Sequence, residues 1–453
     1  MEKVLEKKES CGIIKPHNGQ GDKTMRAIDL INRDIPCACG RIHRCDVPYV
    51  AVGEGAIFHL TDWCGGYSHI LLVADENTDA VAGDRVRELL SEQSVRSCVF
   101  HQKKPVIPNE DAVAYVESMM DGQTDLVLGI GSGVINDICK YVSFEKKIPC
   151  GIVATAPSMD GYASSGAAMI FKGMKVTFTT HAPRMILGDV AILNTAPVEM
   201  IRAGYADIIG KYSALCDWRL SEAVNGEYFC PLIYRAVKEK TDEIRALAPR
   251  LAARDEEAVG VLMDALVMIG ACMTLISTTR PASGSEHHLS HYFEITGLIE
   301  NSPYFLHGID VGYATAVTAA LREEILAMDA PVFHSVDRDR RMACYRRIYG
   351  DFAGEVMAIQ DKAGQYERKM DGIYRARWDE IRRILSECPT AAKITEMLRD
   401  AGFVMEDFEG LYGKRKIRNG IWFGKDLKDR YSVLWLYASL CLTDSEIEKI
   451  LSE

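Results

Sequence analysis

The sequence predicts an α/β domain with a parallel sheet, followed by an all-α domain. Short apolar runs alternate with helical patterns up to residue 195, which is typical of parallel strands covered by helices. Beyond residue 195 strand signals nearly vanish, and long helical patterns follow one another. The length of 453 residues suggests two or three domains. We therefore divide the chain into an N-terminal leader at 1–45, an α/β domain at 46–195 and an all-helical domain at 196–453.

The apolar runs define the expected elements. Strands are expected at residues 49–53, 70–75, 95–101, 125–129, 151–155 and 185–193, with a hairpin arm at 169–180. Between them, helices are expected at 55–60, 80–90, 111–120 and 134–142. Later helices are expected at 198–222, 230–253, 255–279, 308–328, 335–348, 352–367, 373–387 and 391–401. The longest apolar stretch, 258–276, contains Asp264 and lacks flanking membrane anchors, so we expect a buried helix, with a membrane span as a remote alternative.

Composition limits the classes of partner. The net charge of −11 and the pI near 5.6 argue against nucleic acid as the main partner. The first eight residues have no apolar core of the kind that a signal peptide needs, and the 14 cysteines are scattered over the chain. We therefore predict a reduced, cytoplasmic protein without a membrane span.

One cysteine cluster stands near the N-terminus, where Cys37, Cys39, His43 and Cys45 follow each other closely. The Cys-x-Cys spacing is tight and no second Cys-x-x-Cys pair follows, so the spacing matches no zinc pattern well. We interpret the cluster as a loop before the first strand, with a structural metal as the minor alternative.

A glycine-rich turn follows the strand expected at 125–129. Gly129, Gly131, Ser132 and Gly133 lead into the helix at 134–142, and Asp137 lies in that helix. Such a turn places bare amides and a positive helix N-terminus where a pyrophosphate binds. The spacing is G-x-G-x-G and not the G-x-G-x-x-G fingerprint of a dinucleotide site. A Rossmann-like cofactor loop and a turn that uses glycine for packing alone both remain open.

The next strand ends in a loop rich in hydroxyl groups, in which Thr155, Ser158, Asp160 and Ser164 are the polar residues of interest. Ligands bind at the carboxyl ends of strands in open parallel sheets, so we expect this loop to contact a ligand. A surface turn of small residues is the alternative.

The residues with the clearest chemistry are histidines in the helical domain. His287 and His291 are four residues apart and lie on one face of a helix, and His307 can return to the same place after a loop. Asp207 lies in an otherwise small and apolar helical segment, where burial is costly for an acid without a cation. The pattern favours a metal with three protein ligands and open positions over two partly exposed, hydrogen-bonded histidines.

Five segments together resemble the sn-glycerol-1-phosphate dehydrogenase family, most closely its bacterial AraM-type members. They are residues 129–137, the loop 155–165, the helix 204–211, the run Arg-Pro-Ala-Ser-Gly-Ser-Glu-His at 280–287, and His307-Gly308. This family belongs to the larger group of iron-containing alcohol dehydrogenases, glycerol dehydrogenases and dehydroquinate synthases. The resemblance covers most of the chain, from Cys37 to 430–434. It implies the fold of that group, with a dinucleotide-binding α/β domain and a metal- and substrate-binding helical domain.

The resemblance implies a cofactor and a ligand set. One divalent ion, zinc or nickel, would be held by Asp207, His287 and His307, because Lys211 cannot bind a metal as an ammonium. NAD(H) or NADP(H) would be held by Asp75, Gly131, Ser132, Gly133, Asp137, Thr155, Ser158 and Ser164. Asp75 ends the second strand and suits the ribose hydroxyls, which favours NAD, although relatives use both nicotinamides.

The implied reaction is the reversible reduction of dihydroxyacetone phosphate to sn-glycerol 1-phosphate. The metal would polarise the C2 carbonyl for hydride attack. His291 is the candidate for proton relay or substrate contact, Asp160 for holding a substrate hydroxyl, and Lys211 for a further catalytic role. The phosphate needs cations in an acidic protein, and the candidates near the motifs are Lys211, Arg280, His288 and His291.

Three alternatives remain open. A glycerol or polyol dehydrogenase would leave Lys211 idle, and a dehydroquinate-synthase-like lyase would need a larger cationic network. A nucleotide-binding regulatory protein without catalysis conflicts with the intact Asp207, His287 and His307. We expect a small phosphorylated substrate, no nucleic acid partner, and a homodimer or higher homo-oligomer.

Overall fold

The computed structural model describes residues 25–101 and 105–452, and its centre is a six-stranded sheet in which every neighbouring pair is parallel. The strand order is β3-β10-β7-β6-β4-β5. The strands are β3 (Tyr49–Gly53), β4 (His69–Asp75), β5 (Ser94–Phe100), β6 (Leu126–Gly131), β7 (Cys150–Ala154) and β10 (Met185–Asp189). The predicted α/β fold is confirmed, because the apolar runs form buried central strands.

The order of the strands reverses between β4 and β6. From β4 the chain moves outward to β5, and from β6 it moves the other way through β7 to β10. The carboxyl ends of β4 and β6 therefore flank a topological switch point, which is where open parallel sheets bind ligands. Asp75 ends β4 and Gly131 ends β6, so both lie at this crevice.

Helices cover both faces of the sheet. On one face α1 (His59–Cys64), the turn η4 (Asp79–Gly83) and α3 (Asp84–Leu89) pack on Ile70, Leu72 and Leu128. On the other face α4 (Glu110–Met119) and α5 (Gly133–Lys146) pack on Leu71, Val73 and Val127. Side chains of β4 thus alternate between two apolar layers, as the period of a strand requires.

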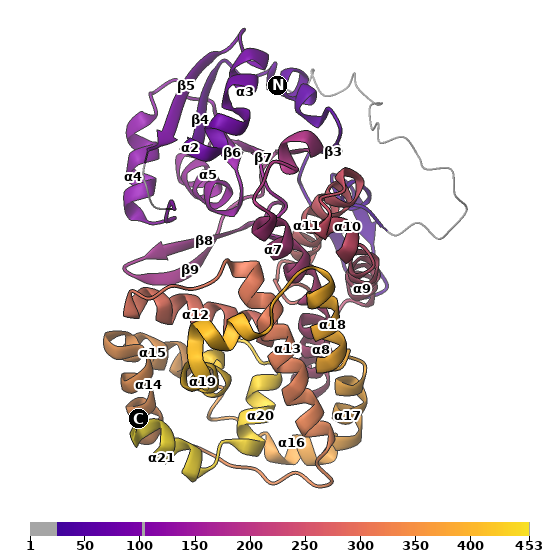
Figure 1. Ribbon diagram of the computed structural model, residues 1–453, viewed down its shortest axis with the longest axis vertical. Coiled ribbons are helices and arrows are strands. Elements are labelled where there is room, and N and C mark those ends of the chain that lie inside the picture. Colours follow the sequence, from indigo (N-terminus) through magenta and orange to yellow (C-terminus); the bar gives the residue numbers. More distant parts are fainter. Residues whose placement is uncertain (1–24, 102–104, 453) are drawn as a thin grey trace, which may run out of the picture.

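The chain after β10 is helical and fills the lower half of Figure 1. Its first helices are α6 (Val190–Leu193), α7 (Val198–Ile209), α8 (Lys211–Asn225), α9 (Pro231–Arg245), α10 (Ala248–Ala252), α11 (Glu256–Ile276), α12 (Ser285–Glu300) and α13 (His307–Leu326). Of these, α9, α10 and α11 lie beside the sheet. The remainder are α14 (Arg338–Tyr349), α15 (Ala353–Ala363), α16 (Asp371–Ala376), α17 (Trp378–Ser386), α18 (Ala391–Asp400), α19 (Glu406–Phe423), η6 (Gly424–Leu427), α20 (Val433–Cys441) and α21 (Asp444–Ser452).

The most apolar helix is α11, which by length and composition could cross a membrane. Within the structure 78% of its apolar window is buried. It packs against α6, α7 and α9 and against the strand β3. The prediction of a buried helix at this place is confirmed.

Several elements differ from the predictions. The helix expected at 198–222 is divided at Gly210, where Val311 of α13 packs directly on the backbone. The strand expected at 185–193 ends at Asp189, because this carboxylate caps α6 through the Ala191 N–H and also accepts from the Ile57 N–H. The helices α19, α20 and α21 were not predicted, although the chain continues to bury apolar residues there.

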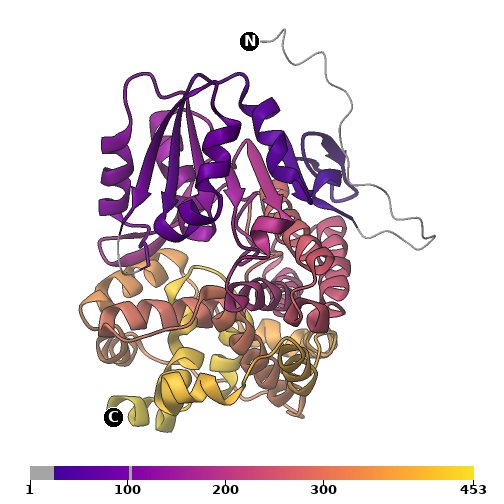
Figure 2. The same cartoon turned by 45° about the horizontal axis from the view of Figure 1, so that its top comes forward.

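The predicted leader is partly structured. Residues 1–24 lie outside the described residues, and residues 27–29 form a 3-10 turn that packs on α11. The hairpin of β1 (Asp34–Pro36) and β2 (Ile42–Arg44) follows, with Ile35 paired to His43. Figures 1 and 2 both place this hairpin beside α9 and α11.

Besides the packing of α11 on β3, two contacts between the halves lie near the histidines. The hairpin β8 (Gly166–Phe171) and β9 (Met174–Thr179) extends from the sheet over α12, where Lys175 pairs with Glu294 (Figure 1). The loop after β7 lies against α7 so closely that a Cβ at Gly204 would come 1.8 Å from the carbonyl oxygen of Pro157. Only glycine permits this approach.

The contact at Gly204 predicts the effect of a single methyl group. Gly204→Ala should lower the stability of the fold by at least about 2 kcal/mol, because the new carbon overlaps backbone that cannot rotate away. The urea midpoint measures this change. The control is Gly410→Ala in α19, where no atom lies within 4 Å of the new carbon. Alanine there should leave stability unchanged or raise it by up to about 1 kcal/mol. Equal midpoints for Gly204→Ala and wild type would contradict the packing described.

Candidate active site

Three side chains of the helical half converge next to the sheet. Asp207 lies in the last turn of α7, His287 in the first turn of α12, and His307 begins α13. One ligand atom of each lies within 4.8 Å of the others, and His287 Nε2 is 3.6 Å from Asp207 Oδ1. One carboxylate oxygen and two imidazole nitrogens at this spacing fit a divalent metal that keeps positions open.

Hydrogen bonds fix the orientation of both imidazoles. The Nδ1–H group of His287 donates to Glu286 Oε1 over 2.7 Å, because a carboxylate can only accept. Ser290 donates its hydroxyl to the backbone carbonyl of His307, so its oxygen accepts from the Nδ1–H of His307 over 3.1 Å. In each ring Nε2 therefore carries the lone pair that a metal needs.

Asp207 has no exposed surface, and its partners are fixed. Its Oδ1 accepts from Lys211 Nζ over 2.7 Å, and its Oδ2 accepts from the backbone N–H of Asp160 over 3.0 Å. Burial and the nearby Asp160 carboxylate raise the pKa of Asp207 to about 7, while Lys211 opposes this. The charged form of this carboxylate is therefore opposed by its burial and favoured by Lys211.

Lys211 is fully engaged within the protein. Its Nζ lies 2.6 Å from Asp160 Oδ2 and 2.7 Å from Asp207 Oδ1, and it donates to the carbonyl oxygen of Ala282 over 2.9 Å. An ammonium has three hydrogens, so these contacts use all of them. Burial opposes the charge, but the two carboxylates raise the pKa of Lys211 above its usual value.

The histidines lie in a cationic surrounding. Burial, followed by the positive charges of Lys211 and Lys428, holds the pKa of His287 well below its usual range. Burial and the charges of Lys428 and Lys175 have the same effect on His291. The ring of His291 is centred 5.4 Å from that of His307. Neutral imidazoles are the form that binds metals.

The glycine turn stands at the switch point of the sheet. Ser132 is the N-cap of α5 without a side-chain cap hydrogen bond. A Cβ at Gly131 would lie 2.6 Å from Ile135 of α5, and one at Gly129 would lie 3.0 Å from the sulfur of Cys139 in α5. These glycines therefore allow α5 to pack closely on β6, and the same close turn points the first amides of the helix at the crevice. Packing and anion binding are compatible uses of the turn.

The other predicted nucleotide residues have varied partners. Asp75 caps the turn after β4, with Oδ1 accepting from the Asn77 and Thr78 amides. Asp137 accepts from the Ala168 N–H and pairs with Lys140, which joins α5 to the β8–β9 hairpin. Within the loop after β7, Thr155 donates its N–H to Gly131, Ser158 is half-buried, and the hydroxyl of buried Ser164 bonds to the Gly161 carbonyl.

Comparisons with known proteins agree with this geometry. The profile of the iron-containing alcohol dehydrogenase family matches residues 51–197. A glycerol-1-phosphate dehydrogenase [NAD(P)+] of Halalkalibacterium halodurans is 36% identical over 63% of this chain and 73% of its own length. A protein of the same name from Bacillus licheniformis is 31% identical over 77% of this chain and 82% of its own. The chain belongs to the glycerol-1-phosphate dehydrogenase family.

Solved structures of lower sequence identity share the fold of this chain. Sulfoacetaldehyde reductase from Bifidobacterium kashiwanohense, solved in complex with NAD+, superposes with a TM-score of 0.58 at 13% identity, covering 91% of this chain and 98% of that one. 1,3-propanediol oxidoreductase gives a TM-score of 0.54 at 16% identity, with coverages of 91% and 99%. The predicted fold and the predicted family of NAD(P)-linked oxidoreductases are confirmed.

The structure brings together the residues that the sequence predicted to be catalytic. Asp160, Lys211 and His291 all lie around the trio of Asp207, His287 and His307. His288 points instead toward the C-terminal segment, where its Nδ1 lies 3.3 Å from the hydroxyl of Ser432.

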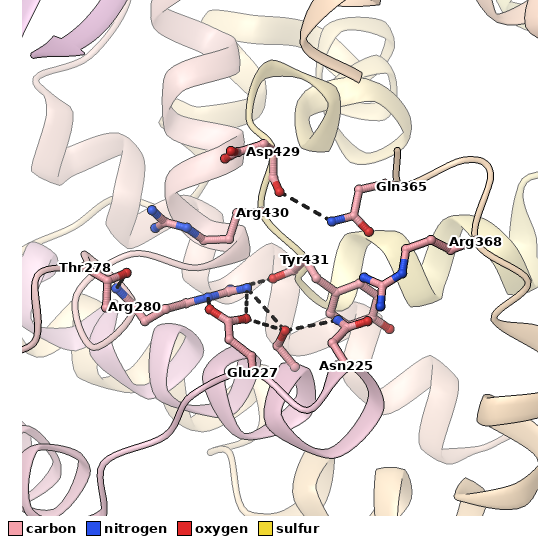
Figure 3. A pocket seen from close by; sticks show the side chains of 10 residues that line it. Asn225, Glu227, Thr278, Arg280, Gln365, Arg368, Asp429, Arg430 and Tyr431 are labelled. Carbon is pink, nitrogen blue, oxygen red and sulfur yellow. Dashed lines mark hydrogen bonds and ion pairs between the residues drawn. The ribbon is translucent and has the colours of Figure 1, made fainter. Parts of the chain in front are cut away.

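Arg280 lies on a neighbouring cavity of about 450 Å³, which Figure 3 shows. Its guanidinium pairs with Glu227 and donates to the Tyr431 carbonyl. Arg430 also lines this cavity and donates to the Ser283 carbonyl. Burial and the charge of Arg280 lower the pKa of Arg430 to about 10.

Four residues of the site were missed from the sequence. Glu286 and Ser290 orient the histidines, and Lys175 and Lys428 supply positive charge. Glu286 and Ser290 are neighbours of His287 and His291 on the same helix, so the helical period was the available signal. Lys175 and Lys428 come from elements far away in the sequence, and nothing in their local pattern singles them out.

Loss of the hydroxyl of Ser290 should weaken metal binding. Ser290→Ala leaves Nδ1 of His307 without its acceptor, so we expect the affinity for a divalent metal to fall about tenfold. Competition with a metal-binding dye measures this. The control is Thr296→Val on the same helix, whose hydroxyl bonds only to carbonyls of its own helix. An equal effect of both substitutions would mean that Ser290 has no orienting role.

Proposed function

We propose that this protein catalyses the reversible, metal-dependent reduction of dihydroxyacetone phosphate to sn-glycerol 1-phosphate with NADH or NADPH. The observation that carries the proposal is the convergence of Asp207, His287 and His307 beside the loop that follows β7. This loop and the glycine turn share the carboxyl edge of the sheet, where the glycine turn would hold a dinucleotide next to the loop that contacts Asp207. The relatives named above carry this activity in their names.

The metal that fits these donors is a borderline divalent ion. Two imidazoles and one carboxylate suit zinc, nickel and iron better than calcium or magnesium. We propose zinc or nickel. When bound, such an ion supplies a Lewis acid for the C2 carbonyl of the substrate.

The protein groups have separate roles in this proposal. Lys211 holds the carboxylates of Asp207 and Asp160 in place and balances their charge. The Asp160 carboxylate, whose Oδ2 lies 2.6 Å from Lys211 Nζ, can also accept from a substrate hydroxyl. His291 is one turn from His287 and moves the proton at the C2 oxygen.

The phosphate of the substrate requires a cation that is not already neutralised. Of the candidates predicted from the sequence, Lys211 and Arg280 are paired with carboxylates, His288 is enclosed, and His291 lies beside the trio as a neutral imidazole that can donate a hydrogen bond but carries no charge. Lys428 adds the charge that is missing. Burial lowers the pKa of Lys428 well below its usual range, and the charges of Arg430 and Lys175 lower it further.

Lys428 is therefore a candidate for binding an anion. Among the described residues no ion pair joins Lys428 to a carboxylate, and the charges of Arg430 and Lys175 outweigh those of Glu286 and Asp429 in their effect on its pKa. A phosphate dianion would relieve that repulsion. We propose that Lys428 and His291 bind the phosphate, with Lys175 and Arg430 adding to the positive field.

The remaining sequence predictions enter the proposal unchanged. Asp75 and the turn of Gly131, Ser132 and Gly133 bind the dinucleotide, and the domain division stays at residue 195. The homo-oligomer and the cytoplasmic location remain predictions from the sequence.

The activity is tested by following NADH oxidation with dihydroxyacetone phosphate and with dihydroxyacetone. We expect turnover with the phosphorylated ketone, loss of turnover after EDTA, and recovery with zinc or nickel. Equal rates with dihydroxyacetone would favour the polyol dehydrogenase. Absence of turnover by the metal-loaded protein would favour the lyase.

The phosphate role of Lys428 is tested by Lys428→Met. We expect the KM for dihydroxyacetone phosphate to rise about tenfold or more, because a partly buried charge pair is lost, while turnover of dihydroxyacetone changes little. The control is Lys416→Met, which removes a surface pair with Glu300. A KM that stays at the wild-type value would remove Lys428 from the phosphate site.

A further inference from the structure

A second cluster of metal-ligating side chains lies far from the active site. Cys37, Cys39, His43 and Cys230 place one ligand atom each within 4.8 Å of the others. The first three belong to the β1–β2 hairpin, and Cys230 immediately precedes α9. We propose that these residues form a structural zinc site that clamps the hairpin to the helical half. The proposal is independent of the proposed catalytic function.

The distances between the ligand atoms match the edges of a zinc tetrahedron. Cys37 Sγ is 3.6 Å from Cys230 Sγ, and His43 Nε2 is 3.3 Å from Cys39 Sγ and 3.4 Å from Cys230 Sγ. Zinc–sulfur and zinc–nitrogen bonds of usual length give edges of about 3.8 Å and about 3.6 Å. The sulfur atoms of Cys37 and Cys230 are too far apart for a disulfide, and both cysteines are free.

The histidine is already oriented for a metal. His43 is buried, and its Nδ1 lies 3.0 Å from the carbonyl oxygen of Leu275 in α11. A carbonyl only accepts, so Nδ1 carries the hydrogen and Nε2 presents its lone pair to the sulfur atoms. A zinc-bound histidine usually has this kind of second hydrogen bond.

Groups that can stabilise negative charge stand beside two of the sulfur atoms. Cys230 is the N-cap of α9, so its sulfur stands at the positive end of a helix. The hydroxyl of Tyr228 lies 3.2 Å from Cys39 Sγ, and the guanidinium of Arg41 lies 3.5 Å above the ring of Tyr228. Three thiolates and one neutral imidazole around Zn²⁺ leave a net charge of −1, which these groups balance. Binding releases the three thiol protons to solvent.

The backbone of the turn between β1 and β2 places the thiols of Cys37 and Cys39 on the same side. Cys37 donates its N–H to Arg41, Gly40 donates its N–H to Cys37, and Gly40 has a φ of 84°. The left-handed conformation of Gly40 turns the chain back so that Cys37 and Cys39 face Cys230. Strands of three residues, as in this hairpin, are marginal by themselves. A metal that joins residues 193 apart in the sequence supplies the missing constraint.

The proposal is tested first by metal analysis of the full chain purified without chelators. We expect two bound metal ions per chain, one of them zinc. Cys230→Ser should lose one ion, and Cys45→Ser should keep both, because Cys45 lies on the same segment but outside the cluster. Asp207→Asn should lose the other ion, so failure of the catalytic proposal would be distinguished from failure of this one.

A spectroscopic experiment tests the proposal on the wild-type chain, so its result does not depend on whether a cysteine variant folds. After exchange of zinc for cobalt, the wild-type chain should show strong near-ultraviolet absorption from sulfur-to-cobalt charge transfer. Asp207 and the active-site histidines contain no sulfur, so Asp207→Asn should keep this absorption and Cys39→Ser should lose most of it. Wild-type protein with one metal per chain and no sulfur-to-cobalt absorption would overturn the proposal. So would a Cys37–Cys230 disulfide in peptide mass mapping.

Discussion

The buried carboxylate of Asp207 constrains the whole active site. A carboxylate without exposed surface needs a compensating charge, and Lys211 supplies it at 2.7 Å from the next helix. The same lysine also pairs with Asp160, which belongs to the loop after β7. One ammonium therefore binds together a helix of one half and a loop of the other. Because removing one partner of a buried ion pair costs about 3–5 kcal/mol, this arrangement tolerates little displacement of either half.

The close approach of the halves depends on small residues. Gly204 and Gly308 let α7 pack on the Pro157 carbonyl and α13 pack on the Ala203 carbonyl, which positions Asp207 and His307. On the far side of the histidines, the β8–β9 hairpin reaches α12 through the pair of Lys175 and Glu294. The sheet thus contributes the cofactor edge, one acid and one lysine, and the helical half contributes the metal donors. Neither half contains a complete site, which explains why the chemistry lies at their junction.

The features that could be predicted are those that leave a local pattern in the sequence, whereas features that depend on residues far apart in the sequence could not be predicted. The parallel sheet, the pair of His287 and His291, and the lone acid at Asp207 leave local patterns of period two or period 3.6. The strand end at Asp189 was missed because its carboxylate starts a helix that apolar periodicity hides. Lys428 becomes important only through its neighbours Arg430 and Lys175, and one of these is far away in the sequence. The Cys-x-Cys pair looked incomplete, since Cys230 lies 193 residues after Cys37.

The two candidate metal clusters differ in their donor atoms, so we expect them to lose metal at different rates. The set of Asp207, His287 and His307 has oxygen and nitrogen donors and only three of them, so a bound ion would keep open positions and several divalent ions would fit. The cluster of Cys37, Cys39, His43 and Cys230 has three sulfur donors and one nitrogen donor from distant segments, which would complete the coordination of a zinc ion. A chelator should therefore empty the active site before it reaches the cysteine cluster. A protein inactivated by mild chelation would still contain zinc, and its fold would remain intact until that second ion is removed.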